Sequence, residues 1–284
     1  MQGIPLDFQD GQTPPENRPY DSAARLLPRS PELEACTATL QHYLECAAVE
    51  ELPDDTQDGL WSTFFPVEKK NTTKVRGCLD LRPLNRHLRY EHFKIEGLHT
   101  VRGLLRRRDF MTKVDMSDYF FHLPIKPKDR KYFRFMWQGK KYQCTAMPFG
   151  LAPAPRLATK ILQPVVRHLR SMGVRVVVYI DDLLVLARSQ EESLRHTQLL
   201  VDTLHHFGFS VHPDKIQAVP TRSIEFLGTQ VNSALMQFRV PKHKIRDLRR
   251  EITLFRSQNE AGELTLRQYS SLIGKLNAVR GAVL

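Results

Sequence analysis

Three aspartates have the residue type and the sequence setting for metal-dependent phosphoryl transfer. Asp181 and Asp182 are adjacent and stand between two runs of Val, Ile and Leu in VRVVVYIDDLLVLAR, residues 174–188. Charges beside so much apolar surface are costly unless they are paired or bind a metal. A third aspartate, Asp115, ends an earlier apolar run. Carboxylate oxygens suit Mg²⁺, and two such ions about 3.5–4 Å apart can hold the attacking and leaving oxygens of an in-line phosphoryl transfer.

The elements expected around these aspartates form a ferredoxin-like sheet. We expect a strand over about 110–115, a helix over about 155–172 and a hairpin that turns near Asp181 and Asp182. Another helix begins at Ser189 with a capping box, and the stretches FSVH and SIEFLGTQV are further strands. Strand, helix, two strands, helix and strand make the split βαβ arrangement, whose antiparallel neighbours can bring the three carboxylates to one sheet edge.

A bland interpretation of the carboxylates stays open. Adjacent aspartates in a turn are common and usually solvated, so YIDD alone favours function weakly. Asp118 follows Asp115 closely, but MSD precedes a short turn, and we expect Asp118 to cap a helix rather than bind a metal.

The flanking segments predict helices and hairpins around this sheet. Residues 1–29 are polar and rich in Pro, which favours a flexible tail. A helix capped by Ser30 follows and stops before Pro53. STFFPVEKK and KVRGCLDLR read as one hairpin and residues 131–150 as a second, turning at Gln138-Gly139. Two basic amphipathic helices follow Pro241.

Composition narrows the class of protein. The hydrophobic fraction of 41% and charged fraction of 26% indicate a globular, soluble chain, and the net charge of +11 favours a polyanionic partner, nucleic acid first. The four cysteines form no Cys-x-x-Cys pair, and no nearby His completes a zinc spacing, so free thiols are expected. With no apolar signal core and no apolar run able to span a bilayer, we expect no membrane partner and a cytoplasmic or nuclear location.

Six motifs in one order resemble the reverse transcriptases. YIDD between apolar strands resembles their catalytic motif, and TKVDMSDYFFHLPI their first aspartate motif. KKNTTKVRGCLDLRPLN resembles the fingers hairpin, TAMPFGLAPAP the segment beside template and nucleotide, and GFSVHPDK with IEFLGTQV the late palm and primer grip. The matches cover roughly residues 60–235. PFGLAPAP and LIGKLNAV are closest in wording to retrotransposon enzymes of the DIRS type.

The resemblance implies an α+β fold: a right-hand polymerase with a ferredoxin-like palm, β-rich fingers and a short helical thumb. The divisions implied are a Pro-rich tail at 1–29, fingers at 30–89 and 123–153, palm at 90–122 and 154–236, and a partial thumb at 237–284. The chain ends soon after the second thumb-like helix, so we expect a fragment or a degenerate copy with weak template affinity and low processivity.

The resemblance also implies catalytic roles. Asp115 and Asp181 would be the main ligands of two Mg²⁺ ions, for which Mn²⁺ could substitute, and Asp182 would be the third carboxylate. Lys215 in PDKIQ could protonate the leaving pyrophosphate, although an exposed loop lysine is nearly as probable on its own pattern.

Further roles concern the deoxynucleoside triphosphate and the primer. Lys69 and Arg76 would meet the triphosphate, and the ring of Phe120 would leave no room for a 2′-hydroxyl. Phe149 stands where retroviral enzymes carry Gln, so only stacking or packing remains there. Phe121 is the better core candidate of the adjacent phenylalanines. The residues expected to shape the primer grip, or simply a buried strand, are Phe226, Leu227 and Gly228.

The function implied is RNA-directed DNA polymerisation from a primer 3′-hydroxyl on an RNA or DNA template, as part of a retrotransposon. One alternative is a catalytically inactive or truncated nucleic-acid-binding relic, which Mg²⁺ would neither stabilise nor equip to bind a triphosphate. A second is an RNA-templated RNA polymerase, against which Phe120 argues. The template, the priming mechanism and the oligomeric state stay open.

Overall fold

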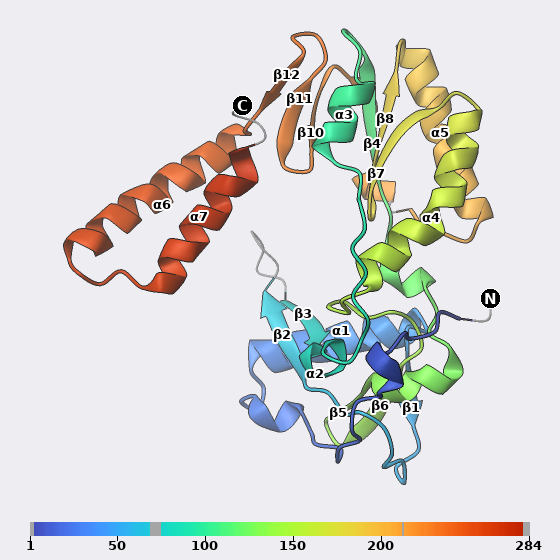
Figure 1. Ribbon diagram of the computed structural model, residues 1–284, viewed down its shortest axis with the longest axis vertical. Helices are drawn as coiled ribbons and strands as arrows, with labels where there is room; N and C mark the ends of the chain where they lie inside the picture. The colour runs from blue at the N-terminus through green and yellow to red at the C-terminus, as the bar shows by residue number, and fades with distance from the viewer. Residues whose placement is uncertain (1–2, 69–74, 212, 281–284) are drawn as a thin grey trace. The chain divides into compact units, whose positions relative to one another are not determined.

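The computed structural model describes residues 3–68, 75–211 and 213–280 and divides into two compact units. Unit 1 comprises residues 1–94 and 118–162, and unit 2 comprises residues 95–117 and 163–284. Helices and antiparallel sheets occur in both units, which confirms the α+β class (Figure 1). In the part of the chain that is described, no helix combines the length and apolarity that a membrane crossing requires.

Unit 1 contains the two expected hairpins. Strands β2 (Phe64–Glu68) and β3 (Val75–Leu79) pair with each other, and β5 (Arg134–Trp137) pairs with β6 (Lys140–Cys144). The turn between β5 and β6 uses positive φ at Gln138 and Gly139, as a tight hairpin requires. The remaining elements of the unit are η1 (Gln9–Gly11), η2 (Ala23–Arg25), α1 (Pro31–Glu45), β1 (Val49–Leu52), α2 (Arg82–Asn85), η3 (Tyr119–His122) and η4 (Pro127–Tyr132).

Helix α1 begins where its capping residue predicts. The Ser30 hydroxyl accepts a hydrogen bond from the Leu33 amide, and Pro31 occupies the first helical position. Cys36, Leu40 and Tyr43 form its buried side. The helix packs against β2 and β3, so it supports the hairpin that carries Arg76.

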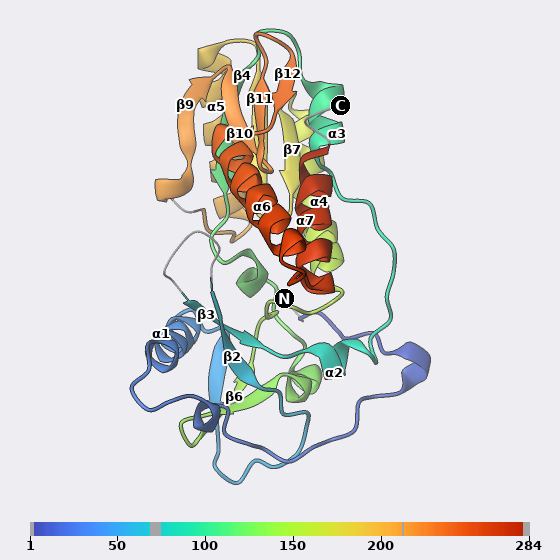
Figure 2. The same ribbon diagram turned by 90° about the vertical axis from the view of Figure 1, so that its left-hand side faces the viewer.

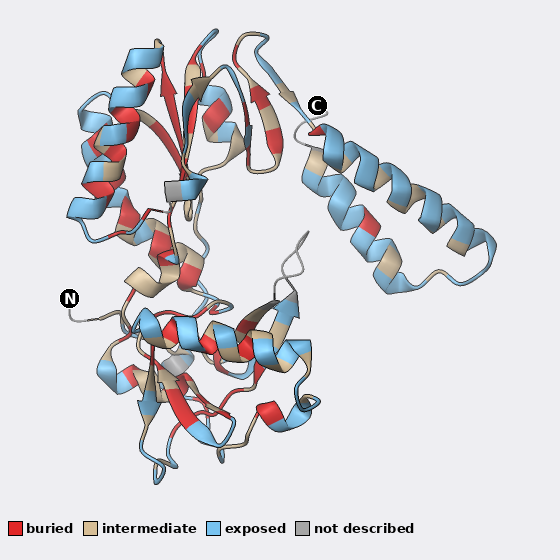
Figure 3. Ribbon diagram, turned by 180° about the vertical axis from the view of Figure 1, so that it is seen from behind, coloured by how far each residue is buried: buried red, intermediate tan, exposed pale blue. Residues whose placement is uncertain are grey.

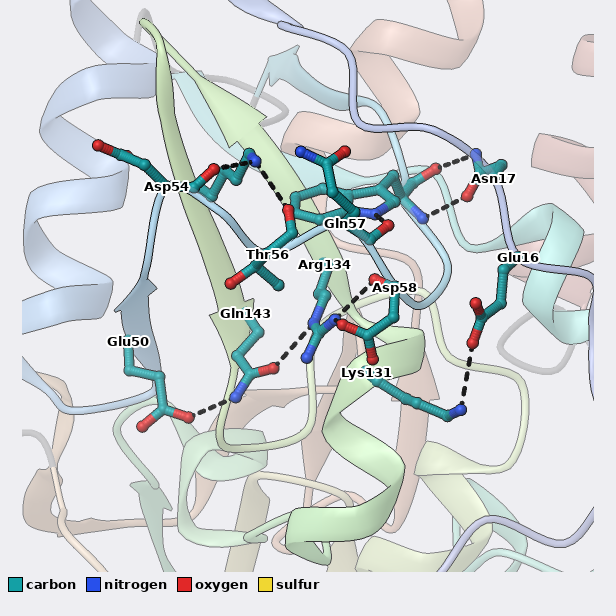
Figure 4. Close-up of polar contacts among 12 residues, drawn as sticks. Glu16, Asn17, Glu50, Asp54, Thr56, Gln57, Asp58, Lys131, Arg134 and Gln143 are labelled. Carbon is teal, nitrogen blue, oxygen red and sulfur yellow. Dashed lines mark hydrogen bonds and ion pairs between the residues drawn. The ribbon is translucent and has the colours of Figure 1, made fainter.

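The N-terminal segment is anchored rather than flexible, which corrects the expectation for residues 3–29. Asn17 accepts a hydrogen bond from the Trp61 amide and donates one to its carbonyl, while Glu16 pairs with Lys131 (Figure 4). Further along, the Ser22 hydroxyl accepts from the Phe64 amide. Backbone hydrogen bonds hold the segment as well, such as those from the Ile4 amide to the Pro124 carbonyl and from the Gln9 amide to the His87 carbonyl. These partners are distant in sequence, so the Pro-rich composition did not predict them.

Unit 2 is built on the expected ferredoxin-like sheet. Its strand order is β7-β8-β4-β9, with β4 at Phe110–Asp115, β7 at Arg175–Tyr179, β8 at Asp182–Ala187 and β9 at Gln217–Thr221. Helix α4 (Ala154–Ser171) precedes β7, and helix α5 (Gln190–His206) follows β8. The Ser189 side chain caps α5, as predicted. This order is that of a split βαβ fold.

The sequence-based prediction for the last strand of this sheet was wrong. Of the stretch FSVH, the described residues 209–211 form no strand but an isolated bridge between Val211 and Met116, and η5 (Pro213–Lys215) follows. The sheet is completed instead by β9, whose residues are mostly exposed. SIEFLGTQV is a hairpin of β10 (Ser223–Phe226) and β11 (Thr229–Asn232), to which β12 (Gln237–Arg239) adds a third strand.

The two faces of the four-stranded sheet are both covered. Helix α5 packs on one face, where Thr112 and Thr197 hydroxyls lie 2.5 Å apart. On the opposite face, α3 (Leu98–Leu104) and the β10–β12 sheet enclose a fully apolar cluster that includes Met111, Leu184 and Phe226. All three residues are buried, and Figure 3 shows buried positions in red along the strands of this unit. The ends of β4 and β8 are therefore fixed by a rigid core.

Helices α6 (Lys242–Glu260) and α7 (Leu266–Arg280) lie side by side (Figures 1 and 2). Lys275 pairs with Glu251, and the rings of Phe255 and Tyr269 are 6.0 Å apart. Most of their surface is exposed.

Candidate active site

Three aspartates meet at one end of the sheet in unit 2. Asp115 is the last residue of β4, and its Cα partner is Asp182, the first residue of β8. Asp181 lies in the turn that joins β7 to β8, and its carbonyl accepts a hydrogen bond from the Met116 amide. Strand register therefore brings the three predicted carboxylate residues together.

The alternation of the strands decides which way the carboxylates face. Met111, Lys113 and Asp115 alternate along β4, so they share the face of the sheet that α3 and β10 cover. The direct partner across the ladder, Asp182, shares that face. Two like charges directly opposite each other destabilise a sheet unless cations compensate them.

Two lysines supply positive charge to this pair. Lys215 Nζ lies 3.0 Å from Asp115 Oδ1, and Lys113 Nζ lies 2.6 Å from Asp182 Oδ1. Among the described residues, the buried Asp182 Oδ1 has no hydrogen-bond partner, so its compensation is purely that of an ion pair. Lys113 was not singled out from the sequence, because its partner Asp182 lies on a neighbouring strand, 69 positions later in the chain.

Asp181 is held in an unfavourable environment for a charge. Burial raises the pKa of its carboxyl, and the nearby Asp182 and Asp115 carboxylates raise it further. Its own backbone amide and Lys215 act in the opposite direction. A cation bound here would relieve this desolvation and repulsion.

The donor set fits a hard divalent cation. All three side chains offer carboxylate oxygens, which Mg²⁺ prefers, and burial and the neighbouring carboxylates disfavour the Asp181 charge in the absence of a cation. Within residues 3–68, 75–211 and 213–280, only His42, Cys46 and Asp118 bring three ligand atoms within 4.8 Å of one another. The aspartates would therefore change side-chain rotamer, away from Lys113 and Lys215, to share an ion.

Lys215 lies next to the aspartates because it precedes β9, a strand that was not predicted from the sequence. It ends η5, directly before β9, and β9 pairs with β4. Its side chain is 55% exposed although its ammonium contacts Asp115. Lys215 is thus both an exposed lysine and a direct neighbour of the aspartates.

Unit 1 brings together three residues predicted to meet the nucleotide. Arg76 lies on β3, opposite Val67, and its guanidinium carbon is 4.4 Å from the centre of the Phe149 ring. Phe120 packs edge-on against Phe149 at 5.5 Å. Lys69, predicted as the second triphosphate contact, lies outside the described residues.

The motif around Phe120 differs from expectation at two positions. Phe121 is only half-buried and contacts Phe149 as well. The core residue is Tyr119, 3% exposed, whose hydroxyl donates to the Ala158 carbonyl. Asp118 makes no side-chain cap, which corrects that prediction; its carboxylate pairs with His42 instead.

The predicted primer-grip residues split between core and turn. Phe226 is fully buried in the apolar cluster of unit 2. Leu227 and Gly228 form the turn between β10 and β11, both with positive φ. Lys244 Nζ donates to the Gly228 carbonyl at 2.9 Å. This basic residue of α6 was left out of the predicted site, because its charge alone is typical of any surface helix.

Comparisons with known proteins were made once this geometry was established. Residues 67–231 match the family described as "Reverse transcriptase (RNA-dependent DNA polymerase)". The Pro-Pol polyprotein of feline foamy virus is 26% identical over 219 residues, which are 77% of this chain and 18% of that protein. The Gag-Pol polyprotein of avian reticuloendotheliosis virus is 29% identical over 205 residues, 65% of this chain and 18% of that protein.

The fold is similar to that of a solved polymerase. The foamy viral protease-reverse transcriptase, solved in complex with an RNA/DNA hybrid, aligns over 97% of this chain and 34% of its own, with a TM-score of 0.74 and 17% identity. The chain thus spans a minor part of each of these relatives, 18% of both viral polyproteins.

Proposed function

This chain belongs to the reverse transcriptase (RNA-dependent DNA polymerase) family, and on that premise we propose that it extends a primer with deoxynucleotides on an RNA or DNA template. The observation that carries the proposal is the Cα pairing of Asp115 with Asp182, beside Asp181. Three carboxylates gathered at adjacent strand ends, one of them buried beside the other two, favour metal-dependent phosphoryl transfer.

We assign the metal site to the three aspartates. Asp115 and Asp181 are the main ligands of two Mg²⁺ ions, or of Mn²⁺ in their place, and Asp182 is the third carboxylate. When bound, such ions stabilise the charge that develops as the primer 3′-oxygen bonds to the α-phosphorus and the bond to pyrophosphate breaks. The rigid β4–β8 pairing orients the carboxylates for this purpose.

Lys215 is proposed as the proton donor to the leaving pyrophosphate. Its ammonium lies 3.0 Å from Asp115 Oδ1, within the group of aspartates. A positioned acid of this kind contributes about 10²–10⁴-fold to rate. The proton lost from the primer 3′-hydroxyl passes to solvent.

Residues of unit 1 are proposed to bind the incoming nucleotide. Arg76 and Lys69 contact the triphosphate, because cations on a hairpin neutralise its charge. The Phe120 ring excludes a ribose 2′-hydroxyl, which selects deoxynucleotides. Phe149 offers no polar group, and its contact with Arg76 suggests that it orients the guanidinium.

The template and primer are proposed to bind through their backbones. The net charge of +11 favours a polyanion, and phosphate contacts give affinity with little sequence preference. The Leu227–Gly228 turn, held by Lys244, is proposed to contact the primer. On the wording of PFGLAPAP and LIGKLNAV we assign the chain to a retrotransposon of the DIRS type.

Primer extension tests the function. Wild-type protein, Asp181→Asn and a control Asp202→Asn on the exposed side of α5 are given a primed RNA template, Mg²⁺ and either deoxy- or ribonucleotides. We expect extension with deoxynucleotides by the wild type and the control only. Duplex binding by all three proteins without extension by any of them would replace the proposal with a non-catalytic relic.

A further inference from the structure

A cluster of three metal-ligating side chains lies apart from the aspartates of the sheet. We propose that His42, Cys46 and Asp118 form a binding site for one Zn²⁺ ion. In the part of the chain that the structure describes, these are the residues that bring one nitrogen, one sulfur and one oxygen ligand within 4.8 Å of one another. All three belong to unit 1.

Two of the ligands come from the C-terminal end of one helix. His42 lies in the last turn of α1 and Cys46, four residues on, is the C-cap residue, whose amide donates to the His42 carbonyl, so the two side chains lie close together. Asp118 comes from a distant segment, directly before η3, and its Oδ2 lies 3.0 Å from His42 Nε2. A search for zinc spacing along the sequence misses this site, because the third ligand follows His42 by 76 positions.

The spacing of the ligand atoms is close to that of a tetrahedral zinc site. Bond lengths of about 2.0–2.2 Å to nitrogen and oxygen and 2.3 Å to sulfur put nitrogen and oxygen about 3.4 Å apart, and sulfur and nitrogen about 3.6 Å apart. The observed separations are 3.0 Å from His42 Nε2 to Asp118 Oδ2 and 3.7 Å from Cys46 Sγ to each of the two ring nitrogens of His42, and all the ligand atoms lie within 4.8 Å of one another. A turn of the His42 ring and closure of the Cys46 and Asp118 side chains on one ring nitrogen would complete the geometry.

The donor set selects the metal. A thiolate and an imidazole favour Zn²⁺ over Mg²⁺, which takes oxygen ligands. One thiolate and one carboxylate also balance the charge of a divalent ion. Because all three residues are exposed, water is free to take the fourth position.

Binding exchanges protons for the metal. Burial, the Asp118 carboxylate and Glu45 raise the pKa of the Cys46 thiol, which therefore keeps its proton until a metal displaces it. The thiol proton leaves to solvent as the sulfur binds the ion.

The two segments that supply the ligands are already joined. The Tyr43 ring, next to His42 on α1, packs edge-on against Phe121 at 4.8 Å, and the Tyr43 hydroxyl donates to the Gly77 carbonyl. The helix and the start of η3 are thus preorganised, so an ion need not order either segment. Bound zinc would add a link between α1 and the segment that carries Phe120, beside the contact of Tyr43 with Phe121.

Cobalt spectroscopy on the full chain tests the site. The reduced, EDTA-treated protein is titrated with Co²⁺ and then with Zn²⁺. We expect one equivalent of Co²⁺ to give tetrahedral d–d bands and a thiolate-to-cobalt charge-transfer band, both abolished by Zn²⁺. Loss of a group that merely orients a ligand costs about 10–100-fold in affinity, so Cys46→Ser, His42→Ala and Asp118→Asn should each lower affinity at least tenfold.

Matched controls separate this site from other metal binding. Cys78→Ser and His92→Ala remove the same donor types elsewhere in unit 1 and should leave affinity unchanged. Zn²⁺ should raise the melting temperature of the wild type and these controls but not of the three ligand variants, whose circular dichroism verifies folding. Unchanged binding in Cys46→Ser, or binding lost instead in Asp181→Asn, would overturn the proposal.

Discussion

The guanidinium of Arg76 stacks over the ring of Phe149, with 4.4 Å between the guanidinium carbon and the ring centre. The same ring contacts Phe120 and Phe121 at 5.5 and 5.9 Å. The apolar Phe149 thus holds the Arg76 guanidinium against the face of its ring. An amide side chain at position 149 would hold it by a hydrogen bond instead. Cation–π contacts contribute about 0.5–2 kcal/mol.

Phe149→Leu should therefore weaken nucleotide binding rather than folding. The smaller side chain keeps apolar contact with Phe120 and Phe121 but removes the ring that orients Arg76. We expect the KM for deoxynucleotides to rise about 2–30-fold, the range that corresponds to about 0.5–2 kcal/mol, with kcat changed less. Steady-state primer extension measures both constants. Phe121→Leu serves as the control and should lower the melting temperature without raising KM; equal KM values in both variants would contradict the role of the stack.

Asp181→Asn should separate metal binding from stability. The variant should lose at least about a hundredfold in extension rate, since a bound metal supplies several kcal/mol of charge stabilisation. In EDTA it should be at least as stable as the wild type, because burial and neighbouring carboxylates disfavour the Asp181 charge. Differential scanning fluorimetry with and without Mg²⁺ checks this. Stabilisation of wild type and variant to the same extent would place the ions elsewhere.

Lys215→Ala should slow the chemical step. If Lys215 donates the proton to pyrophosphate, single-turnover extension should slow by about 10²-fold or more. Lys215→Arg keeps the ion pair with Asp115 but gives up its proton far less readily, so it should stay slow. Lys160→Ala, an exposed lysine on α4, controls for charge. Full rescue by arginine would assign Lys215 a purely electrostatic role.

Phe226 and Leu227 should differ in what they support. Phe226 is fully buried in the apolar cluster, so Phe226→Ala should cost about 3–5 kcal/mol of unfolding free energy. Leu227 lies in the turn, so Leu227→Ala should change stability little and weaken primer binding. Urea unfolding and fluorescence anisotropy with a labelled primer–template provide the two measurements. Comparable loss of stability in both variants would argue against a separate role for the turn.

His196 should make stability depend on pH below neutrality. Burial of its ring on α5 holds the pKa below its ordinary value of 6.5, an effect that Glu192 partly offsets. A lowered histidine pKa means that the unfolded chain binds the proton more readily, so stability falls as pH drops through 6.5 toward the folded pKa. His196→Gln should flatten the melting temperature between pH 7 and pH 5. A variant with the wild-type slope would assign the pH dependence to other groups.

Local sequence patterns predicted the strands whose residues alternate and the helices that begin at a capping residue. The bounds of β4, the turn between β5 and β6 and the Ser30 and Ser189 caps all follow from residues close in sequence. The proximity of Asp115 to Asp182 also followed, because a ferredoxin-like order leaves few alternatives for their strands.

Features that depend on distant partners were missed. Strand β9 contains Pro220, and its residues are mostly exposed. An edge strand tolerates both features, but without buried positions it shows no alternation of apolar and polar residues. Lys113 and Lys244 gain their roles only from contacts across the fold. Asn17 anchors a Pro-rich segment through two hydrogen bonds to Trp61, and amino-acid composition does not indicate such bonds.

Strands β4 and β8 pair without interruption, from Phe110 opposite Ala187 to Asp115 opposite Asp182. This continuous register limits which mutations the two strands can accept. A slip of one residue would turn every side chain of a strand to the opposite face. Single-residue insertions or deletions in either strand would thus displace the carboxylates and the buried Met111 or Leu184 together. A related chain that has lost activity but still folds should therefore differ by substitutions in these strands, with their length preserved.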